Sequence, residues 1–145
     1  KLFMFDTSHL HPMIVHFPIA IVMVGFLFEI CTLIFKKELW LPKASYWLLL
    51  LGTLAGIVAY VSGELFTSDF SGTAAIVKHT HETLAAITLV TLIINSILKI
   101  YINRKHLEHT GIRWVSFALY LLSAICVGIT GFYGGNLVYN YMMPL

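Results

Sequence analysis

Four long apolar segments, separated by short polar stretches, dominate the pattern of this 145-residue sequence. Each segment is long enough for the about 20 residues that a helix needs to cross the hydrocarbon core of a bilayer. Continuous apolar runs of this length predict helices, whereas strands of a membrane barrel would alternate in polarity over about 10 residues. We therefore predict an all-α integral membrane four-helix bundle, a single domain over residues 1–145 with spans at approximately 14–36, 45–66, 80–103 and 112–134.

The composition indicates that water is not the solvent for most of this chain. Hydrophobic residues make up 59% of the sequence and charged residues 11%, against roughly 45–50% and about 25% in a typical globular domain. This balance excludes soluble enzymes and secreted disulfide scaffolds, and we expect Cys31 and Cys126 to be packing residues within apolar runs. A net charge of +2 is too small for a nucleic-acid partner. The expected surroundings are the lipid bilayer and other membrane subunits.

The basic residues predict the orientation of the bundle. Seven of the nine flank the connections between the first two spans and between the last two, namely Lys36, Lys37, Lys43, Lys99, Arg104, Lys105 and Arg113. An excess of Lys and Arg in short loops marks the cytoplasmic side of a membrane. We therefore expect both termini and the 67–80 connection on the outer side, which is the periplasmic side if the protein lies in a bacterial inner membrane.

Five of the seven histidines are expected at one depth in the membrane. They are His9, His11 and His16 near the start of the first span and His79 and His81 near the start of the third. Both of these ends lie on the predicted outer side. Ionisable side chains at membrane depth are costly and indicate function by default, although imidazoles at a membrane interface can also extend their polar ends into water.

Helical spacing selects among these histidines. The helix face of His81 continues through small or polar residues such as Thr88, which indicates an interior with room in it. His79 is two residues away, about 200° around the helix, and we expect it to face water. On the first span we expect His16 to be helical, whereas Pro12 disfavours a helical conformation at His11. His16 and His81 are therefore the predicted pair across the bundle.

Two neutral imidazoles on facing helices are what a six-coordinate b-type haem requires, together with apolar walls. We expect His16 and His81 as the axial ligands of the haem iron. The other candidate site residues are His11 as a supporting or alternative ligand, His79 as an alternative ligand, and Gly56 and Gly63, which make room for the porphyrin ring. A compact copper, zinc or non-haem iron site built from the same imidazoles stays open as an alternative.

The sequence carries no Ser/His/Asp pattern, phosphate-binding loop or CxxC motif. Whether the protein is an enzyme therefore stays open, and an electron-transfer or structural subunit is favoured over a stand-alone enzyme. Glu29 interrupts the first apolar run. We expect this carboxyl to be buried and either protonated or hydrogen-bonded to Thr53 or Ser116.

Four short motifs follow one another in a recognisable order. The first is HPMIVHFPIA at residues 11–20, followed by SGE at 62–64, HE at 81–82 and GGNLVY at 134–139. Together they resemble a family of small bacterial four-helix membrane proteins classed as domain of unknown function 2231, and the resemblance covers essentially the whole chain. Members often occur beside or fused to cytochrome c-like and Rieske-like domains, which implies a redox role. The resemblance carries the family's histidine positions onto His11, His16 and His81.

The tail departs from the pattern of that family. Many members have His-Gly shortly after Leu-Val-Tyr, where this sequence has Tyr141 and Met142. If the tail histidine is a ligand in those members, this chain has lost it or replaced it with Met142 or Met143.

The leading functional expectation is therefore a membrane-embedded b-type cytochrome-like subunit that exchanges electrons with a cytochrome c or a quinone near the periplasmic face. One alternative is a haem-free structural subunit that anchors a larger redox or photosynthetic complex. Another is a copper- or iron-binding membrane protein.

Overall fold

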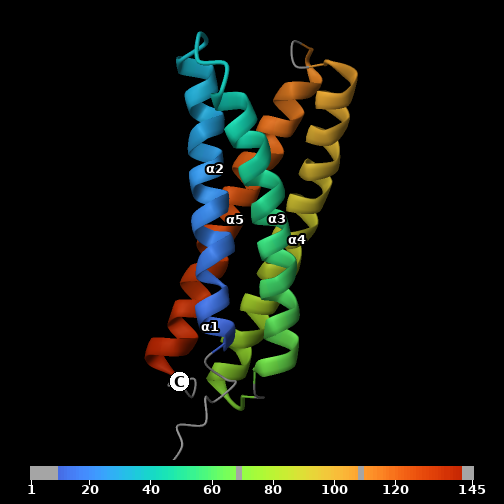
Figure 1. Ribbon diagram of the computed structural model, residues 1–145. Coiled ribbons are helices and arrows are strands. Elements are labelled where there is room, and N and C mark those ends of the chain that lie inside the picture. The colour runs from blue at the N-terminus through green and yellow to red at the C-terminus, as the bar shows by residue number, and fades with distance from the viewer. Residues whose placement is uncertain (1–9, 68–69, 108–109, 142–145) are drawn as a thin grey trace, which may run out of the picture.

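The computed structural model describes residues 10–67, 70–107 and 110–141. Its helices form one bundle in which the described chain begins and ends at the same end (Figure 1). The helices are α1 (Leu10–Ile14), α2 (His16–Ile34), α3 (Leu41–Phe66), α4 (Thr73–Lys105) and α5 (Ile112–Asn140). Counting α1 and α2 as one segment, four helical segments are long and apolar enough to cross a membrane. The predicted all-α membrane fold is confirmed.

α4 and α5 each extend beyond the predicted apolar span. α4 begins at Thr73 rather than near residue 80, and α5 ends at Asn140 rather than near residue 134. Backbone conformation sets the limits of α4, because Gly72 before it has φ +63° and His106 after it has φ +54°. Polar residues in a terminal turn lower the hydropathy without stopping the helix, since that turn can extend beyond the hydrocarbon core.

Pro12 does not unwind the chain at His11, contrary to our expectation. His11 is helical within α1, and the helix is interrupted only at Val15, between α1 and α2. Pro12 and Pro18 each lie in the first turn of their own helix, where an amide hydrogen would have no partner in any case. Val15 itself keeps a right-handed helical backbone, and its amide bonds to the carbonyl oxygen of His11, so α1 and α2 together form one nearly continuous segment.

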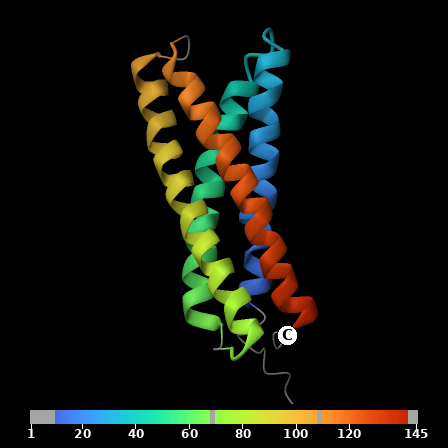
Figure 2. The same ribbon diagram turned by 180° about the vertical axis from the view of Figure 1, so that it is seen from behind.

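The helices pair as two antiparallel hairpins. α2 packs most extensively against α3, and α4 packs most extensively against α5, as both views of the bundle show (Figures 1 and 2). The centre of the bundle is a cluster of five buried residues drawn from all four long helices, namely Val22, Leu49, Leu92, Tyr120 and Val127. Many other large apolar side chains are exposed on the outside, Phe17, Leu54 and Phe132 among them, which suits a surface that faces lipid.

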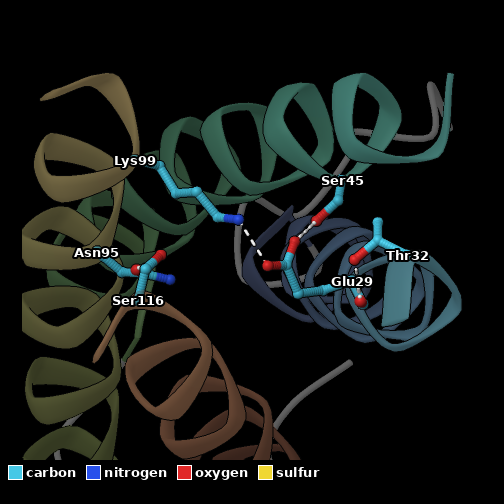
Figure 3. A network of polar contacts seen from close by, with 6 residues as sticks. All are labelled: Glu29, Thr32, Ser45, Asn95, Lys99 and Ser116. Atoms are coloured by element: carbon cyan, nitrogen blue, oxygen red, sulfur yellow. Dashed lines mark hydrogen bonds and ion pairs between the residues drawn. The ribbon is translucent and has the colours of Figure 1, made fainter. Parts of the chain in front are cut away.

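Glu29 is buried as expected, but its partners differ from the predicted ones. Ser45 Oγ donates a hydrogen bond of 2.6 Å to Glu29 Oε2, and Lys99 Nζ lies 2.6 Å from Glu29 Oε1 (Figure 3). The predicted partners bond elsewhere: Thr53 pairs with Ser96, and Ser116 donates to Asn95. A lysine ammonium attracts a buried carboxylate more strongly than a neutral hydroxyl does, and its long side chain spans the gap between the hairpins.

Candidate functional site

A cavity of about 510 Å³ lies at the end of the bundle where the described chain begins and ends. This volume falls within the roughly 300–1,000 Å³ typical of small-molecule and cofactor sites. Its lining includes all five of the residues predicted to hold a cofactor, namely His11, His16, His81, Gly56 and Gly63. His79 is exposed and does not line the cavity. The cavity therefore gathers the sequence-predicted residues in one place.

His11 is buried on α1 and is held by α3. Its Nδ1 lies 2.8 Å from Ser62 Oγ. The Ser62 hydroxyl has one hydrogen, which it donates to the carbonyl oxygen of Ala59 at 2.7 Å, because a carbonyl can only accept. Ser62 must then accept from His11 Nδ1–H. In the neutral ring this leaves the lone pair of His11 Nε2 available to a ligand.

His81 is held in the same way by α5. Its Nδ1 lies 3.0 Å from the carbonyl oxygen of Thr130, so Nδ1 carries the hydrogen and donates it. Within the described parts of the chain, no residue forms a hydrogen bond with Nε2 of either His81 or His11. A backbone or side-chain acceptor on the remote ring nitrogen is what typically fixes the tautomer and orientation of a metal-binding histidine.

The rings of His11 and His81 form an edge-to-face pair in the lining of the cavity. Their centroids are 6.4 Å apart and their planes are inclined at 80°. Each ring lies against a glycine: a Cβ added at Gly63 would lie 3.1 Å from His11 Cε1, and one added at Gly134 would lie 3.0 Å from His81 Cε1. Both separations are tighter than ordinary van der Waals contact, so each glycine makes room for an imidazole.

His16 lines the cavity but takes a different position from the predicted one. It is exposed, and its Nδ1 donates to the carbonyl oxygen of Pro12 at 2.6 Å, four residues earlier in the chain. The ring pair that the structure shows joins His81 to His11 rather than to His16. From the sequence, His11 had a supporting or alternative role. In the structure it is His11, and not His16, that pairs with His81.

Sequence reasoning missed the residues that orient the two rings. Ser62 and Gly134 belong to the SGE and GGNLVY motifs, but the motifs give no contact partner. Thr130 acts through its backbone carbonyl, so its side-chain chemistry carries no signal. A usable signal is the spacing of Thr130 and Gly134, which are four residues apart and therefore share a helix face.

The donor set consists of two imidazoles. Within residues 10–67, 70–107 and 110–141, no group of three or more His, Cys, Asp or Glu side chains is arranged to hold a metal ion. A set of two nitrogen donors would hold only a group that supplies the remaining ligands of its metal itself, as a porphyrin does. His9, Met142 and Met143 lie outside the described residues, so the proposed replacement of a tail ligand stays a prediction.

Comparison with known proteins identifies one family. The family model described as predicted membrane protein (DUF2231) matches residues 7–144. No curated protein and no solved structure matches the chain.

Proposed function

The chain belongs to the DUF2231 family of predicted membrane proteins, and on that premise we propose that it is a b-type cytochrome-like electron-transfer subunit that holds haem between His11 and His81. The close pairing of two buried or half-buried imidazoles from different hairpins is the observation that carries this proposal. A haem iron supplies a reversible one-electron couple when it is bound. Electron transfer requires no further reactive side chain, which agrees with a cavity whose walls are mostly apolar.

The separation of the rings would allow His11 and His81 to hold one metal ion between them. A metal–histidine bond is about 2.0–2.1 Å long, so two opposed imidazoles on one metal have ring centres about 6–6.5 Å apart. The centroids of His11 and His81 are 6.4 Å apart. The hydrogen bonds from Nδ1 to Ser62 and Thr130 keep the Nε2 lone pairs available, which supports ligation by both rings.

The surrounding helices favour a flat apolar ligand. The cavity lies between the α2–α3 hairpin and the α4–α5 hairpin, and apolar side chains such as Ile19, Leu89 and Val127 line its walls. These side chains would exclude water from the ligand, and Gly56 provides further room on α3. Because each hairpin contributes one histidine, a ligand between the hairpins is held from both faces.

We place the cavity at the periplasmic face of a bacterial inner membrane. Seven basic residues flank the α2–α3 and α4–α5 connections at the opposite end of the bundle, and such an excess marks the cytoplasmic side. The electron partner is then a cytochrome c or a quinone, reached within a larger membrane complex.

Haem binding can be tested on the purified protein in detergent by its pyridine haemochrome and low-spin absorbance spectra. We expect His11→Ala and His81→Ala to abolish low-spin coordination, because each removes one axial nitrogen. His16→Ala and the exposed control His79→Ala should retain it. Loss with His16→Ala but not His11→Ala would restore the pair predicted from the sequence.

Elemental analysis of the same samples separates the alternatives. Iron together with haem absorbance supports the proposal. Copper, or iron without haem absorbance, would replace it with a metal-handling protein. Absence of both after reconstitution with haemin would leave a structural anchor subunit.

A further inference from the structure

The two hairpins of the bundle carry the same pattern of residues. The N-terminal hairpin covers residues 10–66 (α1–α3) and the C-terminal hairpin covers residues 73–140 (α4–α5). In each, a histidine near the start of the first helix bonds through Nδ1 to the second helix and lies against a glycine there. The histidines are His11 and His81, and the glycines are Gly63 and Gly134.

One offset in residue number relates the first helices of the two hairpins. Glu29 and Lys99 are 70 residues apart in the chain. His11 and His81 have the same separation, and so do Val22 and Leu92, which both belong to the central buried cluster. Three pairs of residues on equivalent helices are therefore related by a single offset.

The second helices are related by an offset that is longer by one residue. This offset separates Gly63 from Gly134. It also separates Leu49 from Tyr120, which both belong to the central buried cluster. The offset is constant within each pair of equivalent helices. The one-residue difference falls in the connection between the helices of a hairpin.

Buried hydroxyls repeat as well. Ser45 and Ser116, both fully buried, are related by the same offset as the other pairs on the second helices. Each donates to a side chain on the first helix of its own hairpin, Ser45 to Glu29 at 2.6 Å and Ser116 to Asn95 at 2.7 Å. The repetition of histidines, glycines, core residues and hydroxyls indicates two like units rather than a chance resemblance of apolar helices.

Two pairs of equivalent residues are in contact between the hairpins. His11 meets its counterpart His81 at one end, and Glu29 meets its counterpart Lys99 near the other end. Contact between counterparts is what a two-fold axis along the bundle produces. The proposed ligand cavity and the ion pair both lie on this approximate axis.

We infer that the inner face of each hairpin is a docking surface for a hairpin of the same fold. The Glu29–Lys99 ion pair restricts this docking to one N-terminal hairpin with one C-terminal hairpin. Two N-terminal hairpins docked in the same way would bring Glu29 against a second Glu29. Two C-terminal hairpins would bring Lys99 against a second Lys99. Only an N-terminal hairpin with a C-terminal hairpin places opposite charges together.

Burial of Glu29 and Lys99 makes the discrimination between matched and like-charged hairpins strong. Glu29 is 6% exposed and the Lys99 side chain is 17% exposed, so neither charge is well screened by water. An unpaired or like-charged group at such a position is far costlier than a matched pair. Complementary charge that also penalises the wrong partner is a recognised source of specificity in helical assemblies.

A charge-swap experiment on the full chain tests this inference. Glu29→Lys, Lys99→Glu and the double variant are unfolded in mixed micelles with a denaturing detergent and followed by tryptophan fluorescence. Each single reversal is expected to lower the folded-to-unfolded ratio at least about a hundredfold. The double variant should recover to within about tenfold of the original chain.

Lys105→Glu is the matched control, because Lys105 lies on the same helix as Lys99 but is exposed. It should change the ratio by less than about fivefold. A double variant as unstable as the single ones, or single variants as stable as the control, would overturn the inference. If neither single variant folds, recovery in the double variant still decides the question. No measurement here involves haem, so failure of the inference and failure of the proposed function are separate results.

Discussion

Gly134 offers a direct test of the contact that positions His81. A methyl group added at this position would lie 3.0 Å from His81 Cε1 and 3.4 Å from His81 Nδ1. The ring is also held by the 3.0 Å bond from Nδ1 to the Thr130 carbonyl oxygen. In Gly134→Ala the ring must therefore move by a few tenths of an ångström and weaken that bond.

Two opposing effects set the size of the change. Replacing glycine by alanine inside a helix stabilises it by about 0.5–1 kcal/mol. Forcing an extra carbon into a well-packed site costs about 1–3 kcal/mol. Gly128→Ala isolates the first effect, because Gly128 lies on the same helix, is exposed and has no atom within 4 Å of an added Cβ. We expect Gly134→Ala to be less stable than Gly128→Ala by about 1–3 kcal/mol.

The assay is the free energy of unfolding in mixed micelles, measured for both variants alone and in a His81→Ala background. Without the imidazole the penalty at Gly134 should disappear, since the added methyl group then has open space. Haem retention should follow the same order, with Gly134→Ala the weaker binder. If the two alanine variants agree within roughly 0.5 kcal/mol while His81 is present, the packing argument is wrong.

Three further predictions concern single features of the bundle. Ser62→Ala should destabilise the protein by about 1–3 kcal/mol, because the His11 Nδ1–H is buried and loses its acceptor. The control is Thr83→Ala, an exposed residue whose hydroxyl bonds within its own helix. In the same unfolding assay this control should cost under roughly 0.5 kcal/mol. Tyr120→Phe should leave the free energy of unfolding unchanged or raise it by up to about 1 kcal/mol, because the Tyr120 hydroxyl is fully buried with no hydrogen-bond partner among the described residues. A decrease in the free energy of unfolding by more than about 1 kcal/mol would show that the hydroxyl has a partner. Single cysteines placed in the 35–40 connection of a chain lacking Cys31 and Cys126 should react with a membrane-impermeant thiol reagent only from the cytoplasmic side, and reaction from outside would reverse the orientation.

The helices and their number were readable from the sequence because burial in lipid demands long apolar segments with internally satisfied backbone groups. The ends were not, since they depend on local backbone conformation at Gly72 and His106 and on polar turns that stay helical. The boundary between α1 and α2 had no hydropathy signal of its own, because Val15 is itself apolar and follows two apolar residues.

The common level of His11, His16 and His81 was likewise readable, because two spans between the first and third helix starts return the chain to the same face. The choice between His11 and His16 was not. Their separation on an ideal helix is about 140°, which places them on different faces without saying which face meets the rest of the bundle. His16 also has a local acceptor at the Pro12 carbonyl, whereas the acceptor of His11 is 51 residues away. Contacts over such a separation depend on how helices rotate against each other, which apolar periodicity constrains only loosely.

The same limit applies to Glu29. Its depth followed from the sequence, but its partner Lys99 lies 70 residues away on the other hairpin. The numbering offset between the hairpins would have supplied this pairing, because counterparts meet where two like units dock. A search for weak internal repeats is therefore more informative for such chains than helical periodicity alone.

The organisation of the site separates two requirements that a bound ligand places on the protein. The orientation of each imidazole is set inside its own hairpin, His11 by Ser62 and Gly63 and His81 by the second helix of the C-terminal hairpin. The distance between the two rings is set by docking of the hairpins, in which the remote Glu29–Lys99 pair takes part. A substitution that disturbs the orientation of a ring should therefore affect one imidazole at a time. A substitution that disturbs the packing of the hairpins should affect both imidazoles together. A variant of Glu29 should therefore disturb the spacing of both imidazoles without touching the cavity, because the ion pair and the cavity lie on the same approximate two-fold axis.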